Sequence, residues 1–421
     1  MIGGVRRVPR QVDGILVLYH FIPPYAETVL DHATAFERYS RFHVWSINTA
    51  ERFPTALGRF RFRAIVLHYS LFGSADYRLD EAFLAYLAAH TADVRIAFFQ
   101  DEHQHTAKRF RFIDEFAVDW VYTLLQTADA EAIYGQRTHG PRVFSTIPGF
   151  VGENLLDQAR RHARPERERP IDVGYRARTL PLAGGRGARE KSEIGREFAA
   201  RAVGTGLTVD IAVDETDRLY GDNWYRFLGS CRAVLGVEAG VSIFDLDDKV
   251  GPTTESYLGE HPGASFEEVW QAVLRPWENN VPYRTVSPRH LEAAAFETCQ
   301  ILFEGMYSGL LEAGTHYIPL RKDFTNFDEV IATFRDLDHR SQVIASAHRD
   351  LIASGRHTYR AFVAGFDEEL ARADILGAPG PRARDVDGAL RHGAGLRRAE
   401  RRLRTGYWRL RMAARRPRRA N

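Results

Sequence analysis

The chain of 421 residues is predicted to fold as an α/β protein with two Rossmann-like, doubly wound domains that face a cleft, followed by a basic helical tail. Three observations lead to this prediction. Short apolar runs alternate with amphipathic stretches along most of the chain. A charged segment with two prolines interrupts that alternation at 159–170 and is predicted to be a linker. The last residues, from 396 on, are strongly basic.

The first domain is predicted to span 1–160. Short apolar or β-branched runs recur in it at intervals of roughly 20 to 30 residues, as strands do when helices separate them. Near-continuous apolar strands of this kind indicate a parallel sheet that is covered on both faces. The predicted strands are 15–21, 43–48, 64–71, 94–100, 119–125 and 142–149.

The second domain is predicted to span 171–345, where the same pattern restarts after the linker. Helices are predicted at 346–370, with a break at Gly355. A basic tail is predicted at 371–421, in which 377–388 is a loop. The predicted strands of the second domain are 171–177, 207–213, 231–237, 298–304 and 316–320.

The composition is that of an ordinary globular protein, with 44% hydrophobic and 27% charged residues. No apolar run approaches the ~20 residues that span a bilayer, and the amino-terminal residues lack the apolar core of a signal peptide. The two cysteines, Cys231 and Cys299, have no metal-type spacing and fit a reducing compartment. We therefore expect a cytoplasmic protein without a metal site.

The stretch SPRHLEAAAFETCQ, 287–300, begins with a strong helix-start signal. Ser287 is a good N-cap and the following proline suits the first helical position. Arg289, His290 and Glu292 lie at the open amino end, where unpaired N–H groups and the helix dipole favour an anion. The pattern predicts a helix start that binds a phosphate, with a carboxylate placed to hold a sugar diol. An ordinary capped helix with a charged first turn is the alternative.

Cations follow the first predicted strand of the second domain. Arg176 and Arg178 come just after this strand, and Lys191 follows at the start of the next helix. Such cations are placed where a diphosphate would need them. A solvated basic loop is the alternative, and the nearby GGRGARE lacks the GK[ST] of a P-loop.

Two further loops after predicted strands carry polar residues among glycines, which permit a ligand to approach the backbone closely. Glu238 and Ser242 follow one strand, and Tyr307, Ser308 and Gly309 follow another. Each could be a plain turn, but the loops converge on one edge of one predicted sheet. We therefore predict a donor-binding site at this edge.

The first domain offers candidates for acid–base chemistry. In FFQDEHQHT, 98–106, the residues Asp101 and His103 follow a strand, and a carboxylate and an imidazole in a cleft could move a proton. His20 ends the first strand and is a further candidate. An exposed polar loop and a structural histidine are the alternatives. No GxGxxG follows the first strand, which argues against a dinucleotide site there.

These segments together resemble the two-domain GT-B glycosyltransferases, within them the group-1-like, spore-maturation CgeB-like branch. The resemblance covers roughly 14–370 and is carried by YHFIPPYAETVLDH, AFFQDEHQ, DVGYRAR, DRLYGDNWYRFLGSCRAVLGVEAGVSIFD and SPRHLEAAAFETCQILFEGMYSGLLEAGTHYIPL. It implies an acceptor on the first domain and a nucleotide-sugar donor on the second, without a metal or other cofactor. By position, Glu292 matches the glutamate that binds the donor ribose. Many members have another glutamate eight residues earlier, where this chain has Arg284.

The resemblance implies transfer of a sugar from a nucleotide-activated donor to a hydroxyl acceptor. A glycan, a lipid-linked molecule or a small molecule could be the acceptor, in synthesis of surface polysaccharide or another glycoconjugate. His103, Asp101 or His20 would position or deprotonate the acceptor hydroxyl. The alternative is a non-catalytic nucleotide- or glycan-binding protein that keeps the fold, which Arg284 favours.

The tail from 396 to 421 contains 11 arginines and one glutamate. Apolar residues recur in it at spacings of three or four, which predicts an apolar stripe on a basic helix. This pattern is typical of adsorption to an anionic membrane surface, here the inner face of the membrane. A disordered basic tail is the alternative, and no nucleic acid partner is expected.

Overall fold

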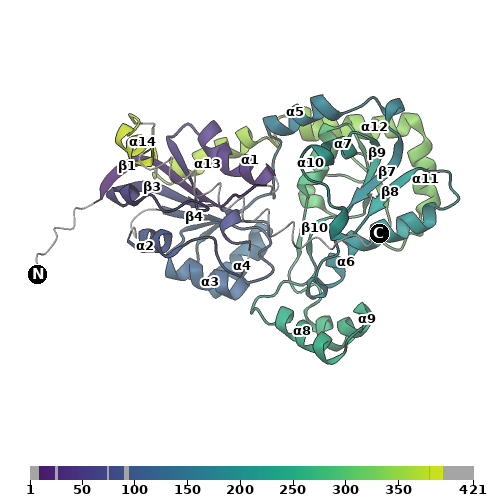
Figure 1. Cartoon of the computed structure of the whole chain (residues 1–421), viewed down its shortest axis with the longest axis horizontal. Coiled ribbons are helices and arrows are strands. Elements are labelled where there is room, and N and C mark those ends of the chain that lie inside the picture. The colour runs from purple at the N-terminus through teal and green to yellow at the C-terminus, as the bar shows by residue number, and fades with distance from the viewer. Residues whose placement is uncertain (1–8, 24–26, 74, 90–93, 379, 392–421) are drawn as a thin grey trace, which may run out of the picture. The chain divides into compact units, whose positions relative to one another are not determined.

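The computed structural model describes residues 9–23, 27–73, 75–89, 94–378 and 380–391 (Figure 1). The strands form a six-stranded sheet, a five-stranded sheet and a two-stranded pair. The predicted membrane-binding tail, 396–421, lies outside the described residues. Among the helices that are described, none is both long enough and apolar enough to cross a bilayer.

The first sheet has the order β2-β1-β3-β4-β5-β6. Parallel pairing joins β1 to β2 and β3, and β3 to β4. The central strand β1 is buried throughout Ile15–Leu18, because both faces of the sheet are covered by helices. Each predicted strand of this domain is found. Their bounds are β1 (Arg10–Tyr19), β2 (Val44–Asn48), β3 (Phe60–Leu67), β4 (Val94–Phe98), β5 (Trp120–Thr123) and β6 (Arg142–Ser145).

The second sheet has the order β13-β12-β9-β7-β8, and its neighbouring strands are parallel. In chain order this is a doubly wound arrangement whose topological switch point lies between β7 and β9. Ligands bind beyond the carboxyl ends of the strands at such a point. The bounds are β7 (Ile171–Arg176), β8 (Val209–Ala212), β9 (Cys231–Gly236), β12 (Cys299–Phe303) and β13 (Ile318–Leu320), again close to the predicted strands.

Helices cover both faces of the second sheet (Figure 1). One apolar cluster packs α6 and α11 against one face, and another packs α5, α7 and α10 against the other. Two Rossmann-like, doubly wound α/β domains are therefore confirmed. The helices of this part of the chain are α5 (Glu153–His162), α6 (Gly185–Ala202), α7 (Asp222–Leu228), α10 (Pro288–Ala295), α11 (Phe327–Arg335) and α12 (Leu337–Ala347).

The chain divides into two compact units. The first contains the described parts of 1–99, 113–121 and 363–421, and the second contains 100–112 and 122–362. The remaining helices before the second sheet and after it are α1 (Glu27–Tyr39), α2 (Glu81–Ala89), α3 (Thr106–Glu115), α4 (Thr127–Arg137), α13 (Tyr359–Arg372) and α14 (Arg384–Arg391).

The end of the described chain packs onto the first unit. Asp367 of α13 accepts hydrogen bonds from the Ser40 hydroxyl, at 2.8 Å, and from the Arg41 N–H, at 2.7 Å. In α14, Asp387 accepts one from the Trp45 indole at 2.9 Å. The predicted loop over 377–388 is wrong for its last residues, since α14 begins at Arg384. The helix is held there by these tertiary contacts, which a short local pattern does not reveal.

The predicted linker also begins too early, because α5 continues to His162. This helix buries Leu155 and Ala159 in the core of the second unit, although its last turn is charged and exposed. The rest of its last turn, 160–162, is charged and without apolar periodicity, which in sequence resembles a linker. Only 163–170 connects α5 to β7.

A helical insertion, 242–280, was not predicted. It lies between β10 (Ala239–Val241) and β11 (Tyr283–Thr285), which pair antiparallel with each other. It carries α8 (Val250–Glu260) and α9 (Phe266–Val269), which lie next to each other at the bottom of Figure 1 and share a small apolar core. A local signal was present, because the Ser265 and Glu268 side chains form a capping box at the start of α9.

Candidate functional site

A pocket of about 1100 Å³ lies at the switch point of the second sheet. The segment after β7, 175–184, and the segment at the end of β9, 234–241, line it. The start of α10, the helix α8 and the loop 101–105 complete its walls. All of these residues belong to the second unit. The pocket therefore lies where a doubly wound sheet binds its ligands.

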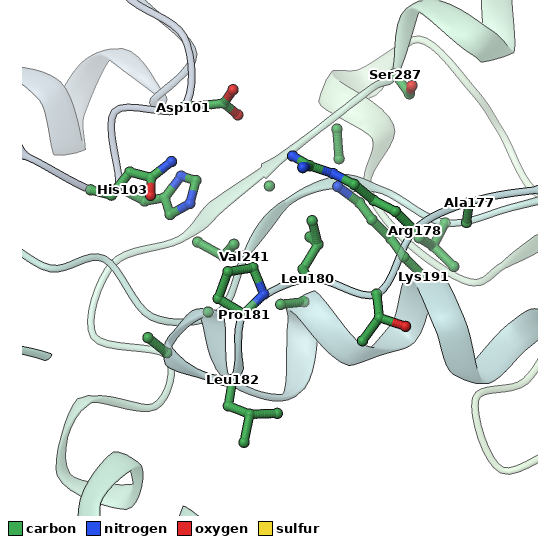
Figure 2. A pocket seen from close by; sticks show the side chains of 18 of the residues that line it. Asp101, His103, Ala177, Arg178, Leu180, Pro181, Leu182, Lys191, Val241 and Ser287 are labelled. Carbon is green, nitrogen blue, oxygen red and sulfur yellow. The ribbon is translucent and has the colours of Figure 1, made fainter. Parts of the chain in front are cut away.

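Cations line the middle of this pocket. In Figure 2 the side chains of Arg178 and Lys191 extend toward the loop that carries Asp101 and His103. Burial and the positive charges of Arg284, Arg289 and Arg178 together lower the pKa of the Lys191 ammonium to about 8, against the opposing effect of Asp101. A bound anion would relieve this repulsion, so the arrangement suits a phosphate group.

The two arginines after β7 differ in what they contact. Arg176 is engaged within the protein: it forms an ion pair with Asp210 at 2.7 Å and lies over the Phe227 ring at 4.3 Å. Arg178 is exposed and reaches into the pocket. Both line the pocket, but the geometry gives Arg178 the freer guanidinium for a ligand.

The start of α10 forms another wall, as the helix-start signal predicted. The Ser287 hydroxyl accepts a hydrogen bond from the Arg289 N–H at 3.4 Å. The Arg289 guanidinium lies over the Trp224 ring at 4.7 Å and donates to the Arg176 carbonyl. Ser287, Arg289 and Trp224 line the pocket. This helix end thus presents N–H groups and a cation to the same space as Lys191.

His290 and Glu292 are buried on α10. His290 donates through Nδ1 to Gln300 Oε1 at 2.9 Å, and burial lowers its pKa to about 4. Glu292 accepts a hydrogen bond from the Trp224 indole at 2.8 Å, and burial raises its pKa. His290 lines the pocket, whereas Glu292 stands behind Trp224 and is not among the lining residues.

The other predicted donor residues lie off the pocket and hold its surroundings together. Glu238 accepts from the N–H groups of Met306 and Tyr307 at 3.1 and 2.9 Å. Its other oxygen lies 3.5 Å from Arg284, which also contacts Glu190. Arg284, in β11, is therefore neutralised by two carboxylates.

Ser242, Tyr307, Ser308 and Gly309 make contacts of the same kind. The Ser242 hydroxyl accepts from the Gly187 N–H at 2.7 Å, which caps the first turn of α6. The Tyr307 hydroxyl donates to the Phe303 carbonyl, and the Ser308 hydroxyl lies 2.8 Å from that of Thr285. The turn has positive φ at 307–309, the φ of Gly309 being 73°. None of the four is a lining residue.

The loop 101–105 faces the cations from the other side. Asp101 and His105 both have positive φ, 50° and 56°, so this loop holds a tight and costly conformation. Burial lowers the pKa of His103 to about 4, and its buried Nδ1 has no hydrogen-bond partner among the described residues. A neutral imidazole with an unpaired nitrogen could accept a proton.

Glu102 anchors this loop. Its carboxylate is fully buried and accepts from the Thr123 hydroxyl at 2.6 Å, the Leu124 N–H at 2.9 Å and the Tyr134 hydroxyl at 2.5 Å. The three donors come from β5, from Leu124 directly after it, and from α4. They hold Glu102 in place, and with it the neighbouring residues Asp101 and His103. Glu102 belongs to the polar stretch 98–106, but the sequence pattern gives no sign of this role.

His20 belongs to the first unit and is not a lining residue. Its ring Nδ1 lies 3.2 Å from the Thr49 hydroxyl, and its backbone N–H donates to the Ser70 hydroxyl at 2.9 Å. Within the described residues no group of three or more His, Cys, Asp or Glu side chains could hold a metal ion.

No family model matches the chain, and no curated protein matches it. Among solved structures, the chain resembles TarM with 10% identity, 75% of this chain covered and a TM-score of 0.40, and it spans 55% of TarM.

It also resembles an alpha-glucosyltransferase in complex with UDP-glucose and DNA containing an abasic site, with 9% identity, 86% of this chain and 100% of that chain covered, and a TM-score of 0.48. The sucrose-phosphate synthase from Thermosynechococcus elongatus gives 9% identity, 87% and 99% coverage, and a TM-score of 0.47. At this identity the fold assignment rests on the two sheets themselves.

Proposed function

We propose that the protein is a glycosyltransferase that transfers a sugar from a nucleotide-activated donor to a hydroxyl acceptor. One observation carries the proposal: Arg178, Lys191 and the amino end of α10 converge on one pocket at the switch point of the second sheet. The loop with Asp101 and His103 faces these cations. Glycosyl transfer requires stabilisation of a diphosphate leaving group and a group that accepts the acceptor's proton.

The reaction breaks the bond between the anomeric carbon and a diphosphate oxygen, and forms one to the acceptor oxygen. Negative charge grows on the departing diphosphate, where Lys191, Arg178, Arg289 and the α10 amino end would stabilise it. The acceptor proton passes to His103, which is neutral at pH 7 because its pKa is about 4, or to Asp101. His20 is a third candidate for this role. The stereochemical outcome is left open.

Glu292 is assigned to the donor ribose, as the resemblance implies. Trp224 and Arg289 line the pocket directly in front of this carboxylate, and its Oε2 already accepts from Trp224. The proposal places a ribose hydroxyl beside the indole, next to Glu292. His290, Ser287 and Arg176 support the same wall, while Glu238, Ser242, Tyr307, Ser308 and Gly309 hold the loops around it.

The proposal has three further parts. The protein belongs to the CgeB-like branch, it acts in surface polysaccharide synthesis, and it lies peripherally at the inner face of the membrane. The basic tail supports the last of these. The full chain should sediment with liposomes of anionic lipid, and a chain that ends at Arg391 should not. That end point keeps α14, which packs on the first unit. Equal sedimentation of both chains would refute membrane binding by the tail.

A non-catalytic nucleotide-binding protein is the second candidate. Arg284 favours it, because two carboxylates hold this arginine at the position where many members of the family have a glutamate. The two candidates differ in slow hydrolysis of the donor, which an active glycosyltransferase shows in the absence of acceptor. If the protein binds nucleotide sugars but hydrolyses none of them, the result favours the second candidate.

The experiment that tests the proposal is calorimetric titration with UDP, GDP, ADP and dTDP. One nucleotide should bind with micromolar affinity and bind more weakly to Glu292→Ala. Donor turnover should persist in EDTA, because cations of the chain take the leaving group. If none of the four nucleotides binds, the glycosyltransferase assignment is wrong.

A further inference from the structure

The pocket has an apolar wall that the proposed chemistry does not use. Leu180 and Leu182 form one part of it, in the segment that follows β7. Val250 and Leu258 of α8 form the other part. Figure 2 shows Leu180 and Leu182 on the side of the pocket away from Ser287. This wall therefore lies at the opposite side from the start of α10.

The helical insertion that supplies α8 is fixed firmly to α6. Arg186 forms an ion pair with Glu267 at 3.0 Å and lies over the Trp270 ring at 4.2 Å. Leu258 and Leu182 pack together with the small core of the insertion and remain half-buried. The wall is thus a built surface with apolar side chains still open to the pocket, rather than a loose loop.

The insertion also contacts the loop that carries the proposed proton acceptor. The Asp245 N–H donates to the His103 carbonyl at 2.9 Å, and Asp248 accepts from the Lys108 N–H at 3.2 Å. An acceptor hydroxyl that reaches His103 therefore brings whatever is bonded to it close to this wall.

The other end of the pocket already offers a place for the nucleoside. Trp224 and Phe227 line that end, with Arg289 over Trp224 and Glu292 behind it. The total volume, about 1100 Å³, is above the ~300–1000 Å³ that a pocket for one small ligand commonly has. The two ends of the pocket differ in their lining, so we assign the donor to the side of α10 and a second molecule to the side of the wall.

We propose that the acceptor carries an apolar group next to its reactive hydroxyl, and that Leu180, Leu182 and Leu258 bind this group, with Val250 buried behind them. The inference rests on the proposed function and narrows its acceptor class to a molecule with an apolar aglycone. An alkyl chain and an aromatic ring share the chemistry that this wall recognises. Free sugars lack it and bind this surface weakly.

The test is the binding and use of matched acceptors by the full chain, loaded with the nucleotide that the titration identifies. The probes are free monosaccharides, their octyl glycosides and their phenyl glycosides. Octyl or phenyl glycosides should bind at least about tenfold more tightly than the free sugars, the factor expected for one well-buried apolar group. Tighter octyl binding indicates a lipid-like source, and tighter phenyl binding an aromatic one.

Variants locate the effect. Leu258→Ser and, independently, Leu182→Ser should weaken glycoside binding and raise KM for glycosides about fivefold to tenfold, with no change in nucleotide affinity. Leu337→Ser is the matched control, because this leucine is 64% exposed and lies at the start of α12, away from the pocket.

Two results would overturn the inference. Equal binding of free sugars and glycosides to the nucleotide-loaded protein would show that the wall is not used. Loss of nucleotide affinity in Leu258→Ser and Leu182→Ser would show that the nucleobase lies there instead. Failure of every nucleotide to bind the unaltered chain is a different result, because it removes the proposed function itself.

Discussion

Two consecutive residues of α6 have opposite electrostatic surroundings. The Glu190 carboxylate, only 12% exposed, contacts Arg284 and accepts from the Lys322 ammonium at 2.8 Å. Lys191 points into the pocket, where Arg178, Arg284 and Arg289 act on it with the same sign of charge. Asp101 opposes them at this ammonium.

The contrast between Glu190 and Lys191 distinguishes charged side chains that stabilise the structure from charged side chains that are placed to bind a ligand. A half-buried ion whose partners are in place has a structural explanation, and Glu190, Arg284 and Arg176 are of this kind. Lys191, whose pKa is lowered and which other cations surround, has no such explanation within the protein, so it marks where an anion belongs. On this criterion Arg178 and Lys191 are better donor-binding candidates than Arg176.

The largest effect is expected at Glu102, a compensated carboxylate next to the pocket. Glu102→Ala should lower the free energy of unfolding by roughly 3–5 kcal/mol, because three buried donors lose their acceptor. Chemical denaturation with the full chain measures this. Activity should fall with it, since the loop of Asp101 and His103 loses its anchor.

Glu102→Gln is the matched control. Its amide oxygen keeps one acceptor, so the loss of stability should be roughly half as large. If alanine and glutamine were both without effect, the carboxylate would not hold the loop, and the geometry of His103 would need another cause.

The next effect sharpens the comparison on α6. Lys191→Met should weaken nucleotide binding by about tenfold to a hundredfold, the range for loss of one charged hydrogen bond to a phosphate. Stability should not fall, because the change removes a cation that the protein itself repels. Calorimetric titration and thermal melting measure the two quantities.

Lys322→Met is the control with the same chemical change. This lysine pairs with Glu190 and does not line the pocket, so nucleotide affinity should stay within about twofold. Equal loss of affinity in both variants would contradict the division between structural and ligand-binding charges.

A smaller effect is expected at Arg284. Arg284→Met leaves Glu190 and Glu238 facing each other without their shared cation, so the free energy of unfolding should fall by about 1–2 kcal/mol. The combined change with Glu190→Gln and Glu238→Gln should recover most of this loss. A large drop in donor turnover with unchanged stability would instead make Arg284 a group that acts on the donor sugar.

The sequence predicted the strands well, because buried parallel strands are nearly continuous apolar runs. It also predicted the helix start at Ser287, since the N-cap and the proline are local signals. The grouping of Arg178, Lys191 and Arg289 followed from strand order alone, because the carboxyl ends of parallel strands share one edge.

Other features depend on contacts that a sequence pattern does not contain. Arg176 and Arg178 are alike in the sequence, and only the position of Asp210 on β8 shows which one is paired. Glu238 and Ser242 lie among glycines as ligand-binding residues do, yet their hydrogen bonds go to the protein backbone. The sequence of the insertion contains one weak local signal, the capping box at Ser265 and Glu268, and no apolar runs that recur as strands do, so the sequence does not predict it.

The smallest effect is the dependence of nucleotide affinity on pH. The pKa of Lys191 is about 8 in the unliganded protein, and a bound diphosphate would raise it because the charged ammonium gains a partner. Affinity should therefore be greatest below pH 8 and decline above it, until pH reaches the pKa of the complex.

Between pH 7 and pH 9 the decline should be about fivefold. Titration of the full chain at both values, corrected for buffer ionisation, measures it. Lys191→Met should show a flat profile at lower affinity, and the same slope in that variant would assign the titration to another group.

Stability should change in the opposite sense: as pH rises from about 8 toward the ordinary pKa of lysine, Lys191 loses its charge in the folded state first and the free energy of unfolding increases. Opposite slopes for affinity and stability at one residue are what a cation that binds a ligand predicts.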